Sequence, residues 1–143
     1  MPTEAEREYA CRAGTTTPFN TGNNLTTDQA NYNGNYPYNG NPKGVSRQNT
    51  VPVNSFSPNA WGLYTMHGNV LEWCSDWFGD RYYDDCKASG TVTNPAGPAT
   101  VSFRVLRGGC WYCFAWYCRS AWRDYDSPGN RSPIVGFRLV FVP

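Results

Sequence analysis

The sequence predicts an α+β domain that combines one helix, short antiparallel strands and long ordered loops. A capped helical pattern lies near the N-terminus, and several short runs alternate apolar and polar residues. Residues 14–60 are rich in Asn, Gly, Thr, Pro and Tyr with little periodicity, so we expect them to form ordered loops. A length of 143 residues suits one hydrophobic core, and we therefore expect a single domain over residues 1–143.

The helix is predicted over residues 3–13. Thr3-Glu-Ala-Glu6 is a capping box, in which the Thr3 hydroxyl accepts a hydrogen bond from the Glu6 amide and the Glu6 carboxylate accepts one from the Thr3 amide. Gly14 is expected to end the helix, because glycine readily adopts the left-handed conformation that follows helices.

Strands are predicted where residues alternate with a period of two. Residues 101–106 and 137–141 alternate in this way, whereas residues 79–100 are rich in Asp, Gly and Pro and predict a linker. We expect the strands to form an antiparallel sheet. The clearest strand has one aromatic face and one polar face, in the order Leu71, Glu72, Trp73, Cys74, Ser75, Asp76 and Trp77.

Charge and composition argue against nucleic-acid and membrane partners. The formal net charge is +1 and the basic residues form no clusters, so the electrostatic footprint of a nucleic-acid-binding protein is absent. No apolar run approaches the roughly 20 residues that span a bilayer, and the residues after Met1 lack the pattern of a secretory signal. We expect neither nucleic-acid binding nor membrane insertion.

Six cysteines leave the redox state open. Cys11 and Cys74 lie in helix and strand patterns, where a free thiol packs like a small apolar side chain. Cys110-x-x-Cys113 has the spacing of a zinc knuckle, but no second pair and no nearby histidine completes a ligand set. Disulfides are the alternative in an oxidising compartment. The only histidine, His67, is expected to be a turn residue that bonds to the backbone.

Residues 108–135 concentrate Trp, Tyr, Cys and Arg in a short segment. Aromatic side chains bring large contact area at low entropic cost, and Tyr, Trp and Arg dominate binding energy at interfaces. The segment therefore predicts a ligand-binding surface on a rigid scaffold. An aromatic core with arginine spacers is the other interpretation, because aromatic residues are more often buried than functional.

Five motifs in a fixed order resemble the formylglycine-generating-enzyme (sulfatase-modifying factor) family. The resemblance covers almost the whole chain and implies an elaborated C-type lectin-like fold, although the first strand and first helix of the family have no counterpart here. The motifs are Pro2-Thr-Glu-Ala-Glu6, Pro58-Asn-Ala-Trp-Gly-Leu-Tyr64, His67-Gly-Asn-Val-Leu-Glu-Trp73, Arg104-Val-Leu-Arg-Gly-Gly109 and Gly136-Phe-Arg-Leu-Val140.

Some members of this family are enzymes, which oxidise a substrate cysteine to formylglycine and bind copper with two cysteines. Cys113 and Cys118 reproduce the spacing of that pair, and two thiolates suit a cuprous ion. The Tyr/Arg-rich insert that the enzymes carry is absent before Arg119, however, and Cys110 replaces their usual serine. A copper-dependent oxidase of peptidyl cysteine is therefore the alternative function.

The variable proteins of diversity-generating retroelements resemble the chain more closely. In these systems a reverse transcriptase randomises adenines in a template copy, and the product is written into the C-terminal end of a lectin-fold gene. Residues 108–135 match the variable segment, with Trp111, Ala115 and Ala121 as an inward-facing frame. The varied, ligand-binding positions implied by the match are Tyr112, Cys113, Phe114, Trp116, Tyr117, Trp122, Asp124, Tyr125, Asp126 and Ser127.

Residue usage in this segment agrees with that mechanism. Asn codons randomised at their adenines never yield Lys, Glu, Gln or Met, and none of these occurs from Gly108 onward. Trp116 and Trp122 do not fit such codons and are either fixed or encoded by another template codon. The resemblance implies a noncatalytic display or receptor protein on a virion or cell surface, with a protein or other macromolecular ligand and no required cofactor.

One metal site is also implied by the family resemblance. Asn69, the Val70 carbonyl and Glu72 would supply hard oxygen ligands for calcium on a rigid turn. In the alternative interpretation Asn69 is a turn residue and Glu72 forms an ion pair. No pair of catalytic carboxylates, nucleophile elbow or phosphate-binding loop is recognisable.

Overall fold

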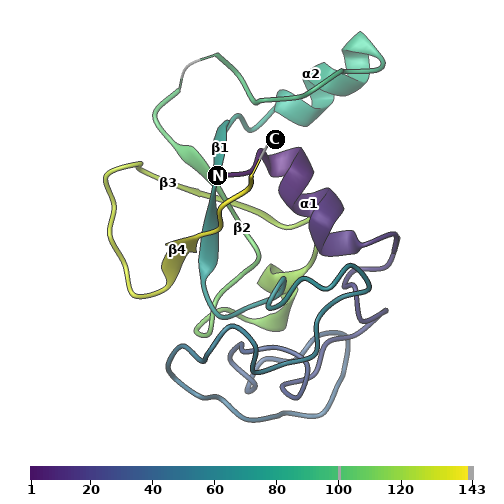
Figure 1. The fold of residues 1–143 in the computed structure, drawn as a ribbon, viewed down its shortest axis with the longest axis vertical. Coiled ribbons are helices and arrows are strands. Elements are labelled where there is room, and N and C mark those ends of the chain that lie inside the picture. The colour runs from purple at the N-terminus through teal and green to yellow at the C-terminus, as the bar shows by residue number, and fades with distance from the viewer. Residues whose placement is uncertain (100, 142–143) are drawn as a thin grey trace.

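The computed structural model describes residues 1–99 and 101–141. Thr100, at the end of the predicted linker, and residues 142–143, at the end of the predicted domain, lie outside the described residues. The long loops that follow the first helix gather at one end of the molecule (Figure 1). The regular elements are α1 (Glu4–Arg12), β1 (Leu71–Trp77), α2 (Tyr82–Ser89), β2 (Arg104–Arg107), the 3-10 helix η1 (Ala115–Cys118), β3 (Arg123–Asp126) and β4 (Val135–Phe137). The predicted α+β class is confirmed.

The strands form a mixed sheet in the order β3-β2-β1-β4. β2 pairs antiparallel with β1 and with β3, as predicted, but β4 pairs parallel with β1. The prediction of a purely antiparallel sheet is therefore wrong at β4. A parallel neighbour requires a long crossover connection, which the residues between β1 and β4 provide.

The helix α1 begins and ends as its sequence predicts. The Thr3 hydroxyl accepts a hydrogen bond from the Glu6 amide at 3.2 Å, and the Glu6 carboxylate accepts one from the Thr3 amide at 2.8 Å. Ala13 adopts the left-handed conformation with φ 46°, and Gly14 continues it with φ 88°. The hydrogen bond from Thr3 lowers the pKa of Glu6, which keeps this carboxylate ionised beside the positive end of the helix.

The predicted linker contains a second helix. α2 occupies Tyr82–Ser89 and projects at the end of the molecule opposite the long loops (Figure 1). None of its residues is buried, and its first residue is preceded by Arg81, whose side chain makes no cap hydrogen bond. The expectation of an irregular linker is wrong here, because a helix without a side-chain cap or a buried apolar face leaves no pattern in the sequence.

The two faces of β1 are as distinct as predicted, but the polar face is the more buried one. Glu72, Cys74 and Asp76 are buried, whereas Trp73 and Trp77 are half-buried. The polar face packs against α1, where the Asp76 carboxylate accepts a hydrogen bond from the Glu4 amide at 2.7 Å. Burial raises the pKa of Asp76.

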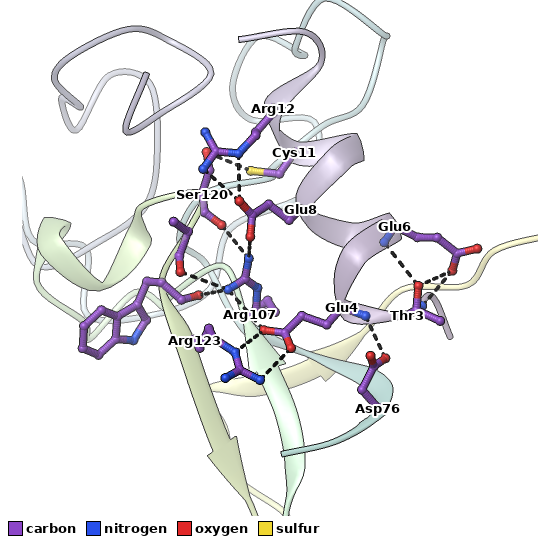
Figure 2. A network of polar contacts seen from close by, with 12 residues as sticks. Thr3, Glu4, Glu6, Glu8, Cys11, Arg12, Asp76, Arg107, Ser120 and Arg123 are labelled. Carbon is purple, nitrogen blue, oxygen red and sulfur yellow. Dashed lines mark hydrogen bonds and ion pairs between the residues drawn. The ribbon is translucent and has the colours of Figure 1, made fainter. Parts of the chain in front are cut away.

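A buried arginine on β2 joins α1 to the sheet. Arg107 is 1% exposed and contacts the carboxylates of both Glu4 and Glu8, which lie one helical turn apart on α1 (Figure 2). Glu4 also accepts hydrogen bonds from the Arg123 guanidinium at 2.7 and 2.8 Å. Helix, second strand and third strand are thus tied together by charge-assisted hydrogen bonds, which are the stronger kind.

The same arginine also fixes the chain that follows η1. Its guanidinium donates to the carbonyl oxygens of Ser120 at 2.8 Å, Ala121 at 3.2 Å and Trp122 at 2.6 Å (Figure 2). A buried guanidinium has five N–H donors and requires acceptors for them. The loop backbone supplies carbonyl acceptors for the N–H groups that the two carboxylates do not bind.

Two apolar clusters complete the core. On the face of the sheet away from α1, Leu71 and Leu106 pack with Cys110. Beneath η1, the long loops contribute a second cluster, which consists of Phe19, Leu25, Ala30, Tyr32, Ala115 and Cys118. Cys113 is half-buried and packs against both clusters, so it lies where the sheet core and the loop core meet.

The last strand is shorter than predicted. Residues 137–141 alternate in sequence, but β4 ends at Phe137, which pairs with Trp73. Arg138 then bonds to the Glu72 carboxylate at 2.8 Å and to the Tyr64 carbonyl at 3.0 Å. Alternation alone does not reveal where a pairing partner ends, which explains the difference.

Replacement of Arg107 by methionine is expected to lower the free energy of unfolding by about 3–5 kcal/mol, because Glu4 and Glu8 would lose a buried counter-charge. Arg12→Gln serves as the control, since Arg12 pairs with the same Glu8 carboxylate near the surface. That change should cost about 1 kcal/mol or less. Urea unfolding measures both values, and equal losses would contradict the special role of Arg107.

Candidate ligand-binding face

The 3-10 helix η1 turns every third side chain inward. Ala115 and Cys118 are fully buried in the loop core, whereas Phe114 and Trp116 are exposed and Tyr117 is half-buried. The small inward side chains let the backbone lie directly on the core. The large side chains on either side of them are thereby left facing solvent.

The loop that contains Tyr36 and Tyr38 packs against these rings. Tyr36 stacks on Phe114 with ring centroids 3.9 Å apart, and Tyr38 stacks on Trp116 at 5.6 Å. The Ala115 amide also donates a hydrogen bond to the Tyr36 carbonyl at 3.1 Å. Neither tyrosine was predicted as a site residue. Their positions among the repeated Asn-Tyr and Asn-Gly pairs indicated only turns.

Arg119 and Trp122 extend the surface. The Arg119 guanidinium carbon lies over the Trp116 ring, 3.7 Å from its centroid, and 5.7 Å from the centroid of the Trp122 ring. Tyr117 contacts Trp122 edge to face at 4.9 Å and Phe114 at 5.7 Å. We refer to these connected side chains as the aromatic cluster, which consists of Tyr36, Tyr38, Phe114, Trp116, Tyr117, Arg119 and Trp122.

The remaining predicted positions lie on β3 and the turn after it. Tyr125 packs on Phe78 at 4.3 Å and Phe103 at 5.1 Å, rather than on a ring of the aromatic cluster. Asp124 is half-buried, and this burial raises its pKa. Asp126 accepts hydrogen bonds from the Ser127 amide at 2.7 Å and the Asn130 side chain at 2.5 Å. The predicted face thus has two parts, a loop part and a strand part.

The inward-facing frame is only partly as predicted. Ala115 is buried and Trp111 is half-buried, but Ala121 is exposed. The expectation that Ala121 points into the core is wrong. This residue contributes its backbone carbonyl, which accepts a hydrogen bond from Arg107.

Cys113 does not belong to the exposed set. Its sulfur is bonded to that of Cys110, and its side chain packs half-buried between the two apolar clusters. The disulfide closes the turn that carries Trp111 and Tyr112, in which the Cys113 amide also donates to the Cys110 carbonyl at 3.0 Å. Cys110 and Cys113, the pair with zinc-knuckle spacing, therefore offer no free thiolate to a metal. In the described residues, no three His, Cys, Asp or Glu side chains lie close enough together to hold a metal ion.

The residues proposed for calcium do not fit that ion. Glu72 bonds to the Arg7 guanidinium at 3.2 Å and to Arg138 at 2.8 Å, so two cations already neutralise its carboxylate. The Asn69 side-chain oxygen accepts hydrogen bonds from Asn31 at 3.0 Å and from the Val51 amide at 2.9 Å. The interpretation of Asn69 as a turn residue and Glu72 as an ion-pair partner agrees with this geometry.

The cysteines proposed for copper do not fit as a pair either. Cys113 is in the disulfide, and Cys118 is fully buried with its thiol 3.7 Å from the Phe114 carbonyl. Burial raises the pKa of Cys118 to about 12, so its thiolate is scarce at neutral pH. A cuprous ion needs thiolate ligands, and this arrangement offers none.

His67 bonds to the backbone, as expected from the sequence. Its Nε2 accepts a hydrogen bond from the Asn20 amide at 3.0 Å, so Nδ1 carries the proton and donates to the Cys118 carbonyl at 2.7 Å. The Cys11 sulfur lies 3.7 Å from Nε2. The ring therefore holds η1 against the loop that contains Asn20.

Comparison with known proteins shows the family of this chain. Residues 1–142 match the sulfatase-modifying factor enzyme 1-like domain. The chain therefore belongs to the sulfatase-modifying factor enzyme 1-like family. This confirms the resemblance inferred from the five motifs, and solved structures of similar proteins confirm the C-type lectin-like fold.

Relatives of this sulfatase-modifying factor-like chain carry different names. The formylglycine-generating enzyme of Streptomyces coelicolor is 40% identical over an alignment of 148 positions, which covers 98% of this chain and 46% of the enzyme. The serine/threonine-protein kinase pkn1 of Chlamydia caviae is 37% identical over 98% of this chain and 20% of the kinase. The chain thus spans about half the length of the enzyme and about a fifth of the length of the kinase.

Two solved structures have the same fold. Treponema denticola variable protein 1 is 34% identical, with a TM-score of 0.72 over 96% of this chain and 45% of that protein. PvdO from Pseudomonas aeruginosa is 32% identical, with a TM-score of 0.73 over 96% of this chain and 50% of that protein. In the described residues of this chain, no helix has the length and apolar character needed to cross a membrane.

Thiol labelling tests the cysteine arrangement. Of the free cysteines Cys11, Cys74, Cys86 and Cys118, only Cys86 is not buried. A maleimide at neutral pH should therefore label one thiol in the native unreduced protein, four after unfolding and six after reduction. Intact-protein mass spectrometry counts the adducts. Six adducts without a reductant would show that Cys110 and Cys113 are not bonded.

Proposed function

We propose that this protein is a noncatalytic ligand-binding protein of the diversity-generating type. The aromatic cluster, together with the adjacent Tyr112, is the contact surface, and the ligand is a protein or another macromolecule. Residues 108–135 are the segment in which variation changes the ligand. The lectin-type fold is the scaffold that keeps the surface in one shape.

The observation that carries this proposal is the exposure of large rings on a fixed backbone. Tyr112 is 65% exposed, Tyr36 50% and Trp116 49%. Contiguous apolar surface of this kind is costly in water and marks interaction sites in soluble proteins. Aromatic rings and arginine are also the residues that supply most binding energy at protein interfaces.

The backbone beneath the rings is held independently of them. Ala115 and Cys118 anchor η1 in the loop core, the disulfide closes the preceding turn, and Arg107 binds the carbonyls that follow. A surface that is ordered before binding loses less conformational entropy when its partner arrives. This arrangement supports a binding role for side chains that contribute little to folding.

The similarity to Treponema denticola variable protein 1 supports the same proposal, since 96% of this chain aligns with it. In this proposal, the strand part of the predicted face makes the protein selective among ligands. Asp124, Asp126 and Ser127 offer polar groups beside Tyr125, and such groups favour a basic or polar region of the ligand.

An oxidase of peptidyl cysteine is the second candidate. It is favoured by the 40% identity to the enzyme of Streptomyces coelicolor and by the spacing of Cys113 and Cys118. The disulfide and the buried Cys118 thiol speak against it.

Substitution in the proposed face should barely change stability. The variant Tyr112→Ser replaces the most exposed ring of the predicted face, and such a change typically costs about 0.5 kcal/mol or less. Ala115→Leu, in the same segment, should cost about 1–3 kcal/mol because it overpacks a fully buried position. Urea unfolding compares the variants. A Tyr112→Ser variant less stable than Ala115→Leu would show that this ring serves the core.

Sequencing of the DNA beside the gene separates a diversified surface from one with a fixed partner. A near-copy of codons 108–135 with adenines at the varied positions is expected. A locus without such a copy would overturn the diversification part of the proposal.

Copper titration distinguishes binding protein from oxidase. The untreated protein should bind cuprous ion no more tightly than its Cys113→Ser variant, and should not oxidise a cysteine peptide. Competition with a chromophoric copper chelator gives the affinity, and mass spectrometry detects the loss of the thiol. Tight binding that Cys113→Ser abolishes, together with turnover of the peptide, would establish the oxidase instead.

A further inference from the structure

A pocket lies beside the aromatic cluster, between the turn that carries Trp111 and Tyr112 and the loop of residues 33–48. It encloses about 310 Å³. This volume is in the range of small-ligand sites, which starts at roughly 300 Å³. Its lining residues are Asn33, Asn35, Ser46, Gln48, Trp111 and Tyr112.

The lining combines neutral polar groups with two aromatic rings. Gln48 and Tyr112 are exposed and Ser46 is half-buried, and within the described residues no hydrogen bond from another protein group occupies their side chains. Asn33 and Asn35 bond to each other, with the Asn35 side-chain N–H donating to the Asn33 carbonyl oxygen at 3.1 Å. This bond leaves the Asn33 amide N–H groups and the Asn35 carbonyl oxygen for a ligand.

The rings form two differently oriented surfaces. Trp111 is half-buried and Tyr112 is exposed, and their planes meet at 75° with centroids 5.9 Å apart. Each ring face offers an apolar platform, and the polar groups of the opposite loop lie across the pocket from them. No side chain in the lining is charged at neutral pH.

We propose that this pocket binds a neutral saccharide. A sugar ring presents apolar C–H faces, which suit aromatic platforms, and hydroxyl groups that both donate and accept hydrogen bonds. Amide and hydroxyl side chains satisfy such groups in both directions. A charged ligand would find no counter-charge in the lining, whereas an uncharged polyhydroxylated one loses no ion solvation on entry.

Both walls of the pocket are fixed before a ligand arrives. The Asn33 amide donates to the Cys113 carbonyl at 2.9 Å, which ties the loop to the disulfide-closed turn. The loop crosses itself at Gly34 and Gly44, where the Gly44 amide donates to the Gly34 carbonyl at 2.9 Å. A Cβ at Gly34 would lie 2.4 Å from the Gly44 oxygen, so only glycine permits this crossing.

Gln48 combines a place in the pocket lining with a strained backbone. It adopts φ 56°, in the left-handed region that residues with a Cβ rarely occupy. Strained backbone of this kind concentrates at ligand sites, where the surrounding structure maintains it. In this pocket the strain places an amide group without a protein partner beside the aromatic turn.

The inference does not rest on the proposed function. Asn33, Asn35, Ser46 and Gln48 lie outside residues 108–135, and Trp111 is a frame position rather than a varied one. Tyr112 is the one lining residue that is also a proposed varied position, so variation there would change one wall of the pocket and leave the other five lining residues in place.

Nitrogen-15 NMR titration of the whole chain tests the pocket. The probes are glucose, galactose, mannose, N-acetylglucosamine and their linear disaccharides, with uridine, adenosine and glycylglutamine as other ligand classes. At least one saccharide should shift the Trp111 indole and Gln48 signals saturably, with a dissociation constant of roughly 1 mM for one sugar ring. The nucleosides and the dipeptide should leave these signals in place.

Gln48→Gly removes the amide while allowing the same backbone conformation. It should weaken saccharide binding about fivefold, as expected for the loss of one or two hydrogen bonds. Asn39→Gly is the matched control, because Asn39 lies in the same loop with φ 48° but outside the pocket lining. Its affinity should be unchanged.

Three results would overturn the proposal. The first is the absence of a shift with every saccharide at 50 mM, which is roughly fifty times the expected dissociation constant. The second is a shift with a nucleoside or the dipeptide but with no saccharide. The third is equal saccharide affinity of Gln48→Gly and the unchanged protein. None of them bears on whether residues 108–135 vary.

Discussion

The structure depends on the buried guanidinium of Arg107. A cation in the core requires compensation on every side, and here two carboxylates of α1 and three carbonyls of the chain after η1 supply it. The helix, the sheet and the aromatic loop therefore meet at one side chain. The interior thus contains this buried polar junction as well as the two apolar clusters.

The proposed ligand-binding face is built from two segments that are distant in the sequence. Residues 31–48 bring Tyr36, Tyr38 and the amide-rich wall, and residues 110–122 bring the other rings. Backbone hydrogen bonds from Asn33 and Ala115 join the segments directly. The family's lectin-type scaffold thus presents a composite surface, in which one segment is outside the proposed region of variation.

Local signals in the sequence were sufficient for the features that depend on near neighbours. The capping box and Gly14 set the limits of α1, and the period of two residues identified β1. The motifs gave the family and placed Phe114 and Trp116 outside the core. Features that depend on distant partners could not be predicted in this way. They include the parallel pairing of β4, the stacking of Tyr36 on Phe114 and the pairing of Arg107 with Glu4.

Arg107 donates hydrogen bonds to the backbone carbonyl oxygens of residues 120–122 and not to their side chains. Every amino acid carries the same backbone carbonyl, so the hydrogen bond from Arg107 to residue 122 does not depend on which side chain the gene encodes there. Ser120 is different, because it is 3% exposed and its hydroxyl oxygen lies 3.6 Å from the Cys11 sulfur. In the proposed function, the hydrogen bond that fixes the loop at residue 122 would thus persist through every substitution at that position.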